Sequence, residues 1–314
     1  MGGQGIDIFF DNVGGEHLEA DVGVPRLHGR ACGWVSCAGA TRGRWSCGSP
    51  TPDPGAVWAG ASDKHHRART PGAPRDAGRT TEESRMTSPT LDSHPAEGEL
   101  RGIALFCHGG TPTSVAPPKE RALSLVRMRA IEQFVLDGAA DRGIGTSLLR
   151  YRVAGWNGAA ADAYNDVRWA IEQLRDAHGP QVPIVLVGHS MGGRAALRAG
   201  GDPQVAAVCG LAPWTPPGEP VEHLRDRTVA ILHGSGDRWV PARLSADFAL
   251  RARAAGADVA RFVTPGGHSM VRGALRWHRF VRDVVLGGAG IEPIRADIAN
   301  ALRRPVPEGL AVRL

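Results

Sequence analysis

The chain has 314 residues, of which 42% are hydrophobic and 22% charged, and this composition is that of a folded protein with a sizeable core. It contains no apolar run of membrane-spanning length and does not begin with a basic segment followed by a long apolar one, so we expect a cytoplasmic protein with no membrane partner. The formal net charge is +5, but the arginines are scattered rather than clustered, so nucleic acid is not an expected partner. The five cysteines have no C-x-x-C spacing, so we predict neither a disulfide framework nor a metal site.

The first residues of the chain have the pattern of a buried strand that runs into a glycine turn, Gly5-Ile6-Asp7-Ile8-Phe9-Phe10-Asp11-Asn12-Val13-Gly14-Gly15. This stretch resembles a fragment of the cofactor domain of medium-chain NADP-dependent dehydrogenases/reductases. The glycine-rich phosphate loop of such a domain would lie upstream, and Gly2-Gly3-Gln4-Gly5 has no strand before it. We therefore interpret residues 1–40 as a remnant of such a domain and expect no cofactor.

Residues 41–90 are dense in glycine, proline, serine, threonine and arginine. Such a segment cannot bury enough apolar surface to offset the loss of chain entropy, so we predict a disordered linker. Met86 is then a plausible start for the functional product. The domain boundaries that follow are a catalytic domain over residues 91–286 and a C-terminal tail over residues 287–314.

Strands and helices alternate through residues 91–286. Helical composition marks 120–140, with an apolar face that includes Leu123, Val126, Ile131 and Val135, and also marks 160–178, 243–255 and 270–286. Strand-like runs precede or separate these helices, at 103–107, 145–151, 182–187, 205–211, 229–232 and 259–263. This alternation predicts a doubly wound, mostly parallel sheet with ligands at the carboxyl ends of its strands.

The run Val182 to Val187 ends in Gly188-His189-Ser190-Met191-Gly192, and an alanine-rich helical segment follows at once. A strand, a sharp turn and a helix around G-x-S-x-G predict a nucleophile elbow, in which Ser190 is held above the end of its strand. The glycines are needed because the turn brings neighbouring backbones into near contact. The amide of Met191, at the start of the helix, can then stabilise a developing oxyanion.

Three further strand ends supply the partners that such a serine requires. His108-Gly109-Gly110-Thr111 follows the first strand of the domain and makes the Gly110 amide the second oxyanion donor. Asp237 and His268 lie in the turns that follow two later strands, in the chain order Ser, Asp, His. We therefore predict that His268 takes the proton of Ser190 and that Asp237 orients the imidazole and stabilises its charged form.

These motifs, H-G-G, G-H-S-M-G, the H-G-x-x-D sequence at Asp237 and the P-G-G-H sequence at His268, resemble those of the α/β-hydrolase superfamily. The resemblance covers nearly all of residues 91–286 and implies the fold of that superfamily, here without the antiparallel pair of strands that usually opens the sheet. The proline-rich segment between Leu211 and Val229 is too short for a helical lid, so we expect an open site. Trp214 and Trp156 are expected to border the substrate, with His189 beside them.

The predicted function is that of a serine hydrolase that cleaves a carboxylic ester or thioester of a small molecule through an acyl-enzyme. A serine at the elbow argues against the epoxide-hydrolase and dehalogenase branches, which use aspartate there. A serine peptidase and a haloperoxidase-like member of the same fold remain alternatives within the superfamily. In other classes, a non-catalytic binding protein with this fold and an NADP-dependent reductase also remain as alternatives.

Overall fold

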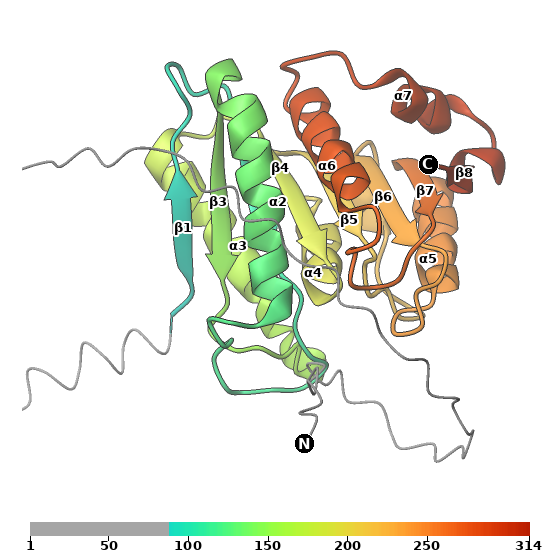
Figure 1. The fold of residues 1–314 in the computed structure, drawn as a ribbon, viewed down its shortest axis with the longest axis horizontal. Coiled ribbons are helices and arrows are strands. Elements are labelled where there is room, and N and C mark those ends of the chain that lie inside the picture. The colour runs from blue at the N-terminus through green and yellow to red at the C-terminus, as the bar shows by residue number, and fades with distance from the viewer. Residues whose placement is uncertain (1–87) are drawn as a thin grey trace, which may run out of the picture. The chain divides into compact units, whose positions relative to one another are not determined.

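An eight-stranded sheet organises residues 88–314, the part of the chain that the computed structural model describes (Figure 1). The spatial order is β1-β3-β2-β4-β5-β6-β7-β8, and every neighbouring pair except β1–β3 is parallel. The strands are β1 (Thr90–His94), β2 (Gly102–Cys107), β3 (Ile144–Arg150), β4 (Ile184–His189), β5 (Val205–Leu211), β6 (Thr228–Gly234), β7 (Asp258–Thr264) and β8 (Val312–Arg313). The remnant proposed for residues 1–40, nearly all of the linker 41–90 and the start at Met86 lie outside the described residues.

Helices cover both faces of the sheet and so create two separate cores. One core joins the sheet to α3, α4 and α5, and the other joins it to α2, α6 and α7. The helices are α2 (Leu123–Ala139), α3 (Asp162–His178), α4 (Met191–Ala199), α5 (Ala242–Ala254), α6 (Ala274–Gly288) and α7 (Ala296–Arg303). Residues of β2 and β4 are buried throughout because helices lie on both sides of them, which explains their continuous apolar runs. The predicted doubly wound sheet is thereby confirmed.

One antiparallel strand opens the sheet, where the sequence predicts no antiparallel pair. Strand β1 lies at the edge of the sheet and pairs with β3, with Thr90 opposite Arg150 and His94 opposite Thr146. Four of its five residues are exposed. An edge strand with one solvated face needs no apolar run, and this strand therefore has no hydrophobic signal.

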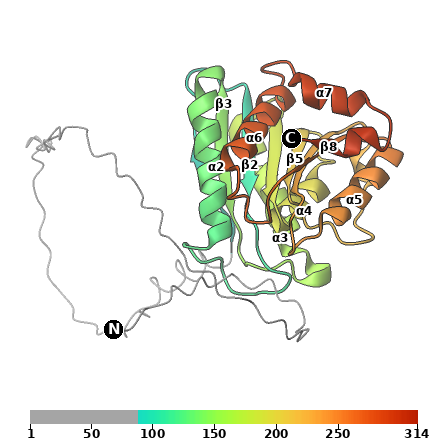
Figure 2. The same cartoon turned by 45° about the vertical axis from the view of Figure 1, so that its right-hand side comes forward.

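Residues 287–314, which we predict as a tail, contain a helix and a strand that complete the domain. Ile298 and Ala301 of α7 are buried in the core that also contains α6. The guanidinium of Arg253 in α5 donates hydrogen bonds to the carbonyls of Ala301, Leu302 and Arg304 at the end of α7. Figure 2 shows these C-terminal residues on the same side of the domain as α5. The tail is therefore an integral part of the fold.

The connection between β5 and β6 is short, as the sequence predicts. Between Leu211 and Thr228 the structure has a single three-residue 3₁₀ turn, Glu222–Leu224. No helical lid is inserted between these two strands. Within residues 88–314, no helix has the length and hydrophobicity needed to cross a membrane.

Candidate active site

Ser190 sits in a strained turn between β4 and α4. Its backbone angles, φ 54° and ψ −118°, lie in a region that side chains other than glycine rarely adopt. A side chain at Gly188 would collide with the backbone of Gly192, and one at Gly192 would collide with the carbonyls of Cys107 and His108 in β2 and the loop after it. The two glycines therefore permit the close approach of backbones that this turn requires, as expected of a nucleophile elbow.

The turns after β6 and β7 bring Asp237 and His268 into contact. Nδ1 of His268 lies 2.7 Å from Oδ2 of Asp237, and the aspartate side chain is fully buried. Because a carboxylate only accepts hydrogen bonds, Nδ1 carries the hydrogen, and Nε2 is left to accept a proton. The other carboxylate oxygen of Asp237 accepts hydrogen bonds from the amides of Trp239 and Val240, at 3.0 and 2.9 Å.

The environment of Asp237 keeps its carboxyl group ionised. Burial by itself raises the pKa of this group, but hydrogen bonds from His233 and His268 outweigh burial and hold the pKa well below its usual range. A carboxylate that is charged at neutral pH can stabilise a positive charge on His268.

Gly110 and Met191, the two predicted oxyanion donors, are neighbours in space. A side chain at Gly110 would collide with the side chain of Met191 and with the carbonyl of Ala154. The Gly110 amide donates to no other described residue, and Met191 begins α4, where helix amides have no partner within the helix. Both amides are thus available to an acceptor beside Ser190.

Two buried histidines support the turns around Ser190. Nδ1 of His108 lies 2.7 Å from the carbonyl of Gly109, and burial lowers the pKa of His108 to about 4, so this ring is neutral. Nε2 of His189 donates to the carbonyl of His268 at 3.1 Å, and its ring lies 4.7 Å from that of His268. Burial lowers the pKa of His189 well below its ordinary value, which is consistent with a flanking role and not with that of a base.

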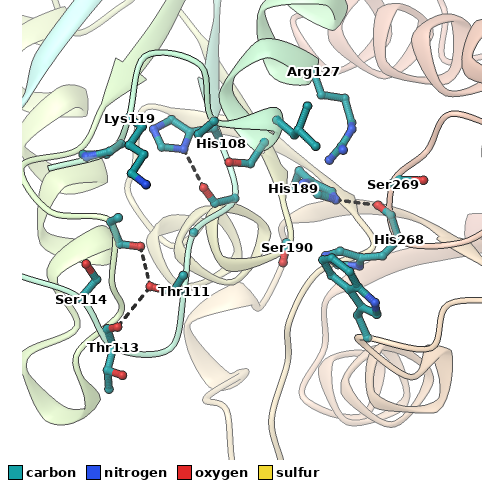
Figure 3. Close-up of a pocket in the computed structure, with 18 of the residues that line it drawn as sticks. His108, Thr111, Thr113, Ser114, Lys119, Arg127, His189, Ser190, His268 and Ser269 are labelled. Atoms are coloured by element: carbon teal, nitrogen blue, oxygen red, sulfur yellow. Dashed lines mark hydrogen bonds between the residues drawn. The ribbon is translucent and has the colours of Figure 1, made fainter. Parts of the chain in front are cut away.

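A cavity of about 550 Å³ contains Ser190, His268, Gly110 and His189 in its wall. Figure 3 shows Ser190 and His268 next to each other beside this space. Eight of the other lining residues come from the loop between β2 and α2, within residues 111–122. This loop is fixed by Asn157, whose side chain donates to the carbonyl of Ser114 and accepts from the amide of Ser114, at 3.0 and 2.9 Å.

The structure corrects the prediction that Trp156 and Trp214 border the substrate, because neither lines this cavity. Trp156 is 2% exposed and meets Trp214 edge to face. The guanidinium of Arg194 lies over both rings, 3.8 Å from the centre of Trp156 and 4.7 Å from that of Trp214. Arg194 also donates to the buried Glu219 at 2.6 Å. This cluster joins α4 to the β5–β6 connection and is structural.

Sequence reasoning missed Trp239, Lys119, Arg127 and Arg238 as lining residues of the cavity. The ring of Trp239 lies 6.0 Å from that of His268 and is half exposed. The proximity of Trp239 to Asp237 in the sequence was an available signal, because the two share one turn. Within residues 88–314, no three His, Cys, Asp or Glu side chains are grouped in a way that would hold a metal ion.

A family model matches the middle of the chain. Residues 137–252 match the family model described as the alpha/beta hydrolase fold. This range includes β3 through most of α5 and therefore both Ser190 and Asp237. The described part of the chain has the α/β-hydrolase fold.

Solved structures show the same architecture. A putative α/β hydrolase from Agrobacterium tumefaciens superposes with a TM-score of 0.51 at 14% identity, covering 65% of this chain and 93% of that one. An acetyl ester-xyloside bifunctional hydrolase from Caldicellulosiruptor lactoaceticus superposes with a TM-score of 0.50 at 16% identity, covering 65% of this chain and 89% of that one. At these identities the likeness defines the fold alone.

The chain also has a short match to a protein of a different class, a reductase. Over 35 residues the chain is 60% identical to (+)-pulegone reductase from Mentha piperita, and the match spans 10% of each chain. It agrees with the reductase-like resemblance of the N-terminal stretch.

Proposed function

We propose that this protein is a serine hydrolase that cleaves a carboxylic ester or thioester of a small molecule through an acyl-enzyme. The observation that carries the proposal is that Ser190 and His268 line one cavity, while Nδ1 of His268 lies 2.7 Å from the buried carboxylate of Asp237. A serine hydroxyl is a weak nucleophile unless a base takes its proton, and an imidazole held by a carboxylate is a base suited to that task.

In the proposed mechanism, Ser190 attacks the carbonyl carbon of the substrate while Nε2 of His268 accepts the serine proton. The Gly110 and Met191 amides donate to the oxygen that becomes negative. His268 then returns the proton to the leaving alcohol or thiol, which departs and leaves the acyl group on Ser190. A water molecule, deprotonated by His268, attacks the acyl-enzyme; His268 then returns the proton to the oxygen of Ser190 as the acid departs.

A fluorophosphonate probe tests the nucleophile directly, because it phosphonylates only an activated serine. We expect the full chain to be labelled and Ser190→Ala to be unlabelled, with ester turnover reduced by a factor on the order of 10³ or more. Ser269→Ala is the matched control, since Ser269 lines the same cavity and should leave labelling at Ser190 intact. Labelling or ester hydrolysis that persists in pure Ser190→Ala would overturn the proposal.

A panel of 4-nitrophenyl esters and acyl thioesters of increasing chain length then separates the two substrate classes.

A further inference from the structure

The charged side chains that line the cavity beside Ser190 are all basic. Lys119, Arg127 and Arg238 line it, whereas none of its described lining residues is an aspartate or a glutamate. Figure 3 shows Lys119 and Arg127 on either side of the space around Ser190. None of the three forms an ion pair with a carboxylate among residues 88–314. The cavity therefore presents uncompensated positive charge to whatever enters it.

Arg127 is the least exposed of the three cations, and its guanidinium has no hydrogen-bond or ion-pair partner in the described part of the chain. The positive charge of Arg127 helps to lower the pKa of His189, so Arg127 lies close to the elbow. Burial lowers the pKa of Arg127, and no nearby carboxylate counteracts this effect. A guanidinium withdrawn from water without an anion is unfavourable, so the position gains stability when an anion binds there.

Two arginines near Arg127, Arg129 and Arg150, are paired with carboxylates, whereas Arg127 is not. Arg129, two residues further along α2, lies 3.4 Å from both Asp92 and Glu120. Arg150 contacts Glu120 and lies 3.5 Å from Asp92. The local carboxylates are thus turned toward Arg129 and Arg150 and away from the cavity.

We propose that the substrates of this cavity carry an anionic group and that Arg127 binds it. The inference rests on the proposed hydrolase function and narrows its substrate class to esters or thioesters that are negatively charged in the acyl part or in the leaving group. A guanidinium presents several donors in a fixed plane and matches the oxygens of a carboxylate or a phosphate. Lys119 and Arg238, which are exposed at the same cavity, add to its attraction for anions.

Two matched pairs of esters test the charge separately on each side of the scissile bond. Mono-4-nitrophenyl adipate and 4-nitrophenyl hexanoate have acyl chains of the same length and differ in a terminal carboxylate. 4-Acetoxybenzoate and 4-acetoxybenzamide differ in the charge of the leaving group. With the full chain, we expect the anionic member to have the higher kcat/KM in at least one pair, and that pair identifies the charged side.

Arg127→Gln should reduce kcat/KM for the preferred anionic ester by about tenfold to a hundredfold more than for its neutral partner. Arg127→Lys, which keeps the charge without the planar fork, should restore part of the preference. Arg129→Gln is the matched control, because it removes a cation from the same helix outside the cavity, and it should leave the ratio unchanged. A high salt concentration should reduce the preference of the wild type.

The outcomes separate the two proposals. Hydrolysis of all four esters with the same anionic-to-neutral ratio in wild type and Arg127→Gln would overturn the inference and leave the hydrolase proposal standing. An equal loss of that ratio in Arg129→Gln would also overturn it, because net charge alone would then be responsible. Failure to hydrolyse any of the four esters, together with failure of fluorophosphonate to label Ser190, would overturn both.

Discussion

His233 places Nε2 3.2 Å from Oδ2 of Asp237, the same carboxylate oxygen that lies 2.7 Å from Nδ1 of His268. His233 is fully buried, and its Nε2 also lies 2.9 Å from the carbonyl of Val240. Since both neighbours of this nitrogen are acceptors, Nε2 carries the hydrogen and donates it. Its other nitrogen, Nδ1, lies 2.8 Å from Oγ of Ser245. A second histidine thus donates to the same carboxylate oxygen of Asp237 as His268 does.

His233→Phe should lower kcat by about tenfold with little change in KM, because Asp237 loses a donor that fixes its orientation and its charge. His233→Gln, whose side-chain amide can donate, should retain more of the activity. His223→Phe is the control, since His223 lies in the turn before β6 and bonds to the carbonyl of Leu197. Steady-state kinetics on one neutral ester measure all three variants. Equal kcat values for wild type and His233→Phe would contradict this role.

Trp239→Ala should alter chain-length preference, because Trp239 lines the cavity beside His268. We expect kcat/KM for hexanoyl and octanoyl esters to fall by about tenfold more than for acetyl esters, as apolar contact is lost. Trp214→Ala, which removes a ring packed on Arg194, should instead lower stability by about 1–3 kcal/mol with an unchanged chain-length profile. Profiles over a series of 4-nitrophenyl esters and thermal unfolding distinguish the two. A profile that changes in Trp214→Ala and not in Trp239→Ala would show that Trp214, and not Trp239, borders the acyl chain.

The parts of the site predictable from the sequence are those encoded locally. The elbow requires Gly188 and Gly192 within five consecutive residues, and the strand before it is an unbroken apolar run because both of its faces are buried. The oxyanion loop and the turns with Asp237 and His268 likewise follow directly on recognisable strands. In a parallel sheet these strand ends meet at one edge, so local signals suffice to bring the residues together.

The parts not predictable from the sequence depend on how one element lies against another. On α2 the apolar face expected to include Leu123 and Val126 leaves both about half exposed, and Glu132 is buried instead. The rotation of this helix on the sheet, which periodicity leaves undetermined to within a residue or two, also directs Arg127 into the cavity. Trp214 is of a residue type that often lines ligand pockets, but the guanidinium of Arg194 packs on its ring.

Glu132 should make the stability of the domain depend on pH. Burial raises the pKa of its carboxyl group from the ordinary 4.5 to about 7, even though Oγ1 of Thr146 donates to it at 3.1 Å. Below pH 4.5 the group is protonated in both the folded and unfolded chain, so it causes no loss. As pH rises to about 7 the unfolded chain releases this proton first, so stability falls, and above that pH the full loss is present.

Glu132→Gln keeps the acceptor for Thr146 and removes the charge. It should therefore raise the free energy of unfolding at pH 8 by about 2 kcal/mol, which corresponds to a Tm higher by roughly 4–8 °C. At pH 5 the gain should be much smaller. Thermal unfolding at the two pH values measures the difference. Glu172→Gln, at an exposed position on α3, is the control and should show no such dependence on pH. A gain for Glu132→Gln that is as large at pH 5 as at pH 8 would show that ionisation is not its cause.

Removal of residues 1–85 should leave the hydrolase activity and Tm of the remaining chain nearly unchanged. Every residue proposed for catalysis, and every strand of the described sheet, lies beyond residue 88. Soluble yield, thermal unfolding and kcat/KM for a neutral ester measure the effect, and NADPH should give no binding signal with the full chain. A collapse in yield or activity would show that the N-terminal residues pack onto the domain.

The pairing of β8 with β7 has a consequence for association between copies of the chain. Val312 and Arg313 pair with Phe262 and Val263, and the Leu314 amide donates to the Val263 carbonyl at 3.0 Å. These last residues occupy hydrogen-bonding groups that β7 would otherwise offer at a sheet edge, where an unpaired strand recruits strands from other molecules. A two-residue strand is itself too short to recruit another chain strongly. The C-terminal residues therefore act as a cap against edge-to-edge aggregation, and proteolytic trimming there would expose β7 while leaving the catalytic turns in place.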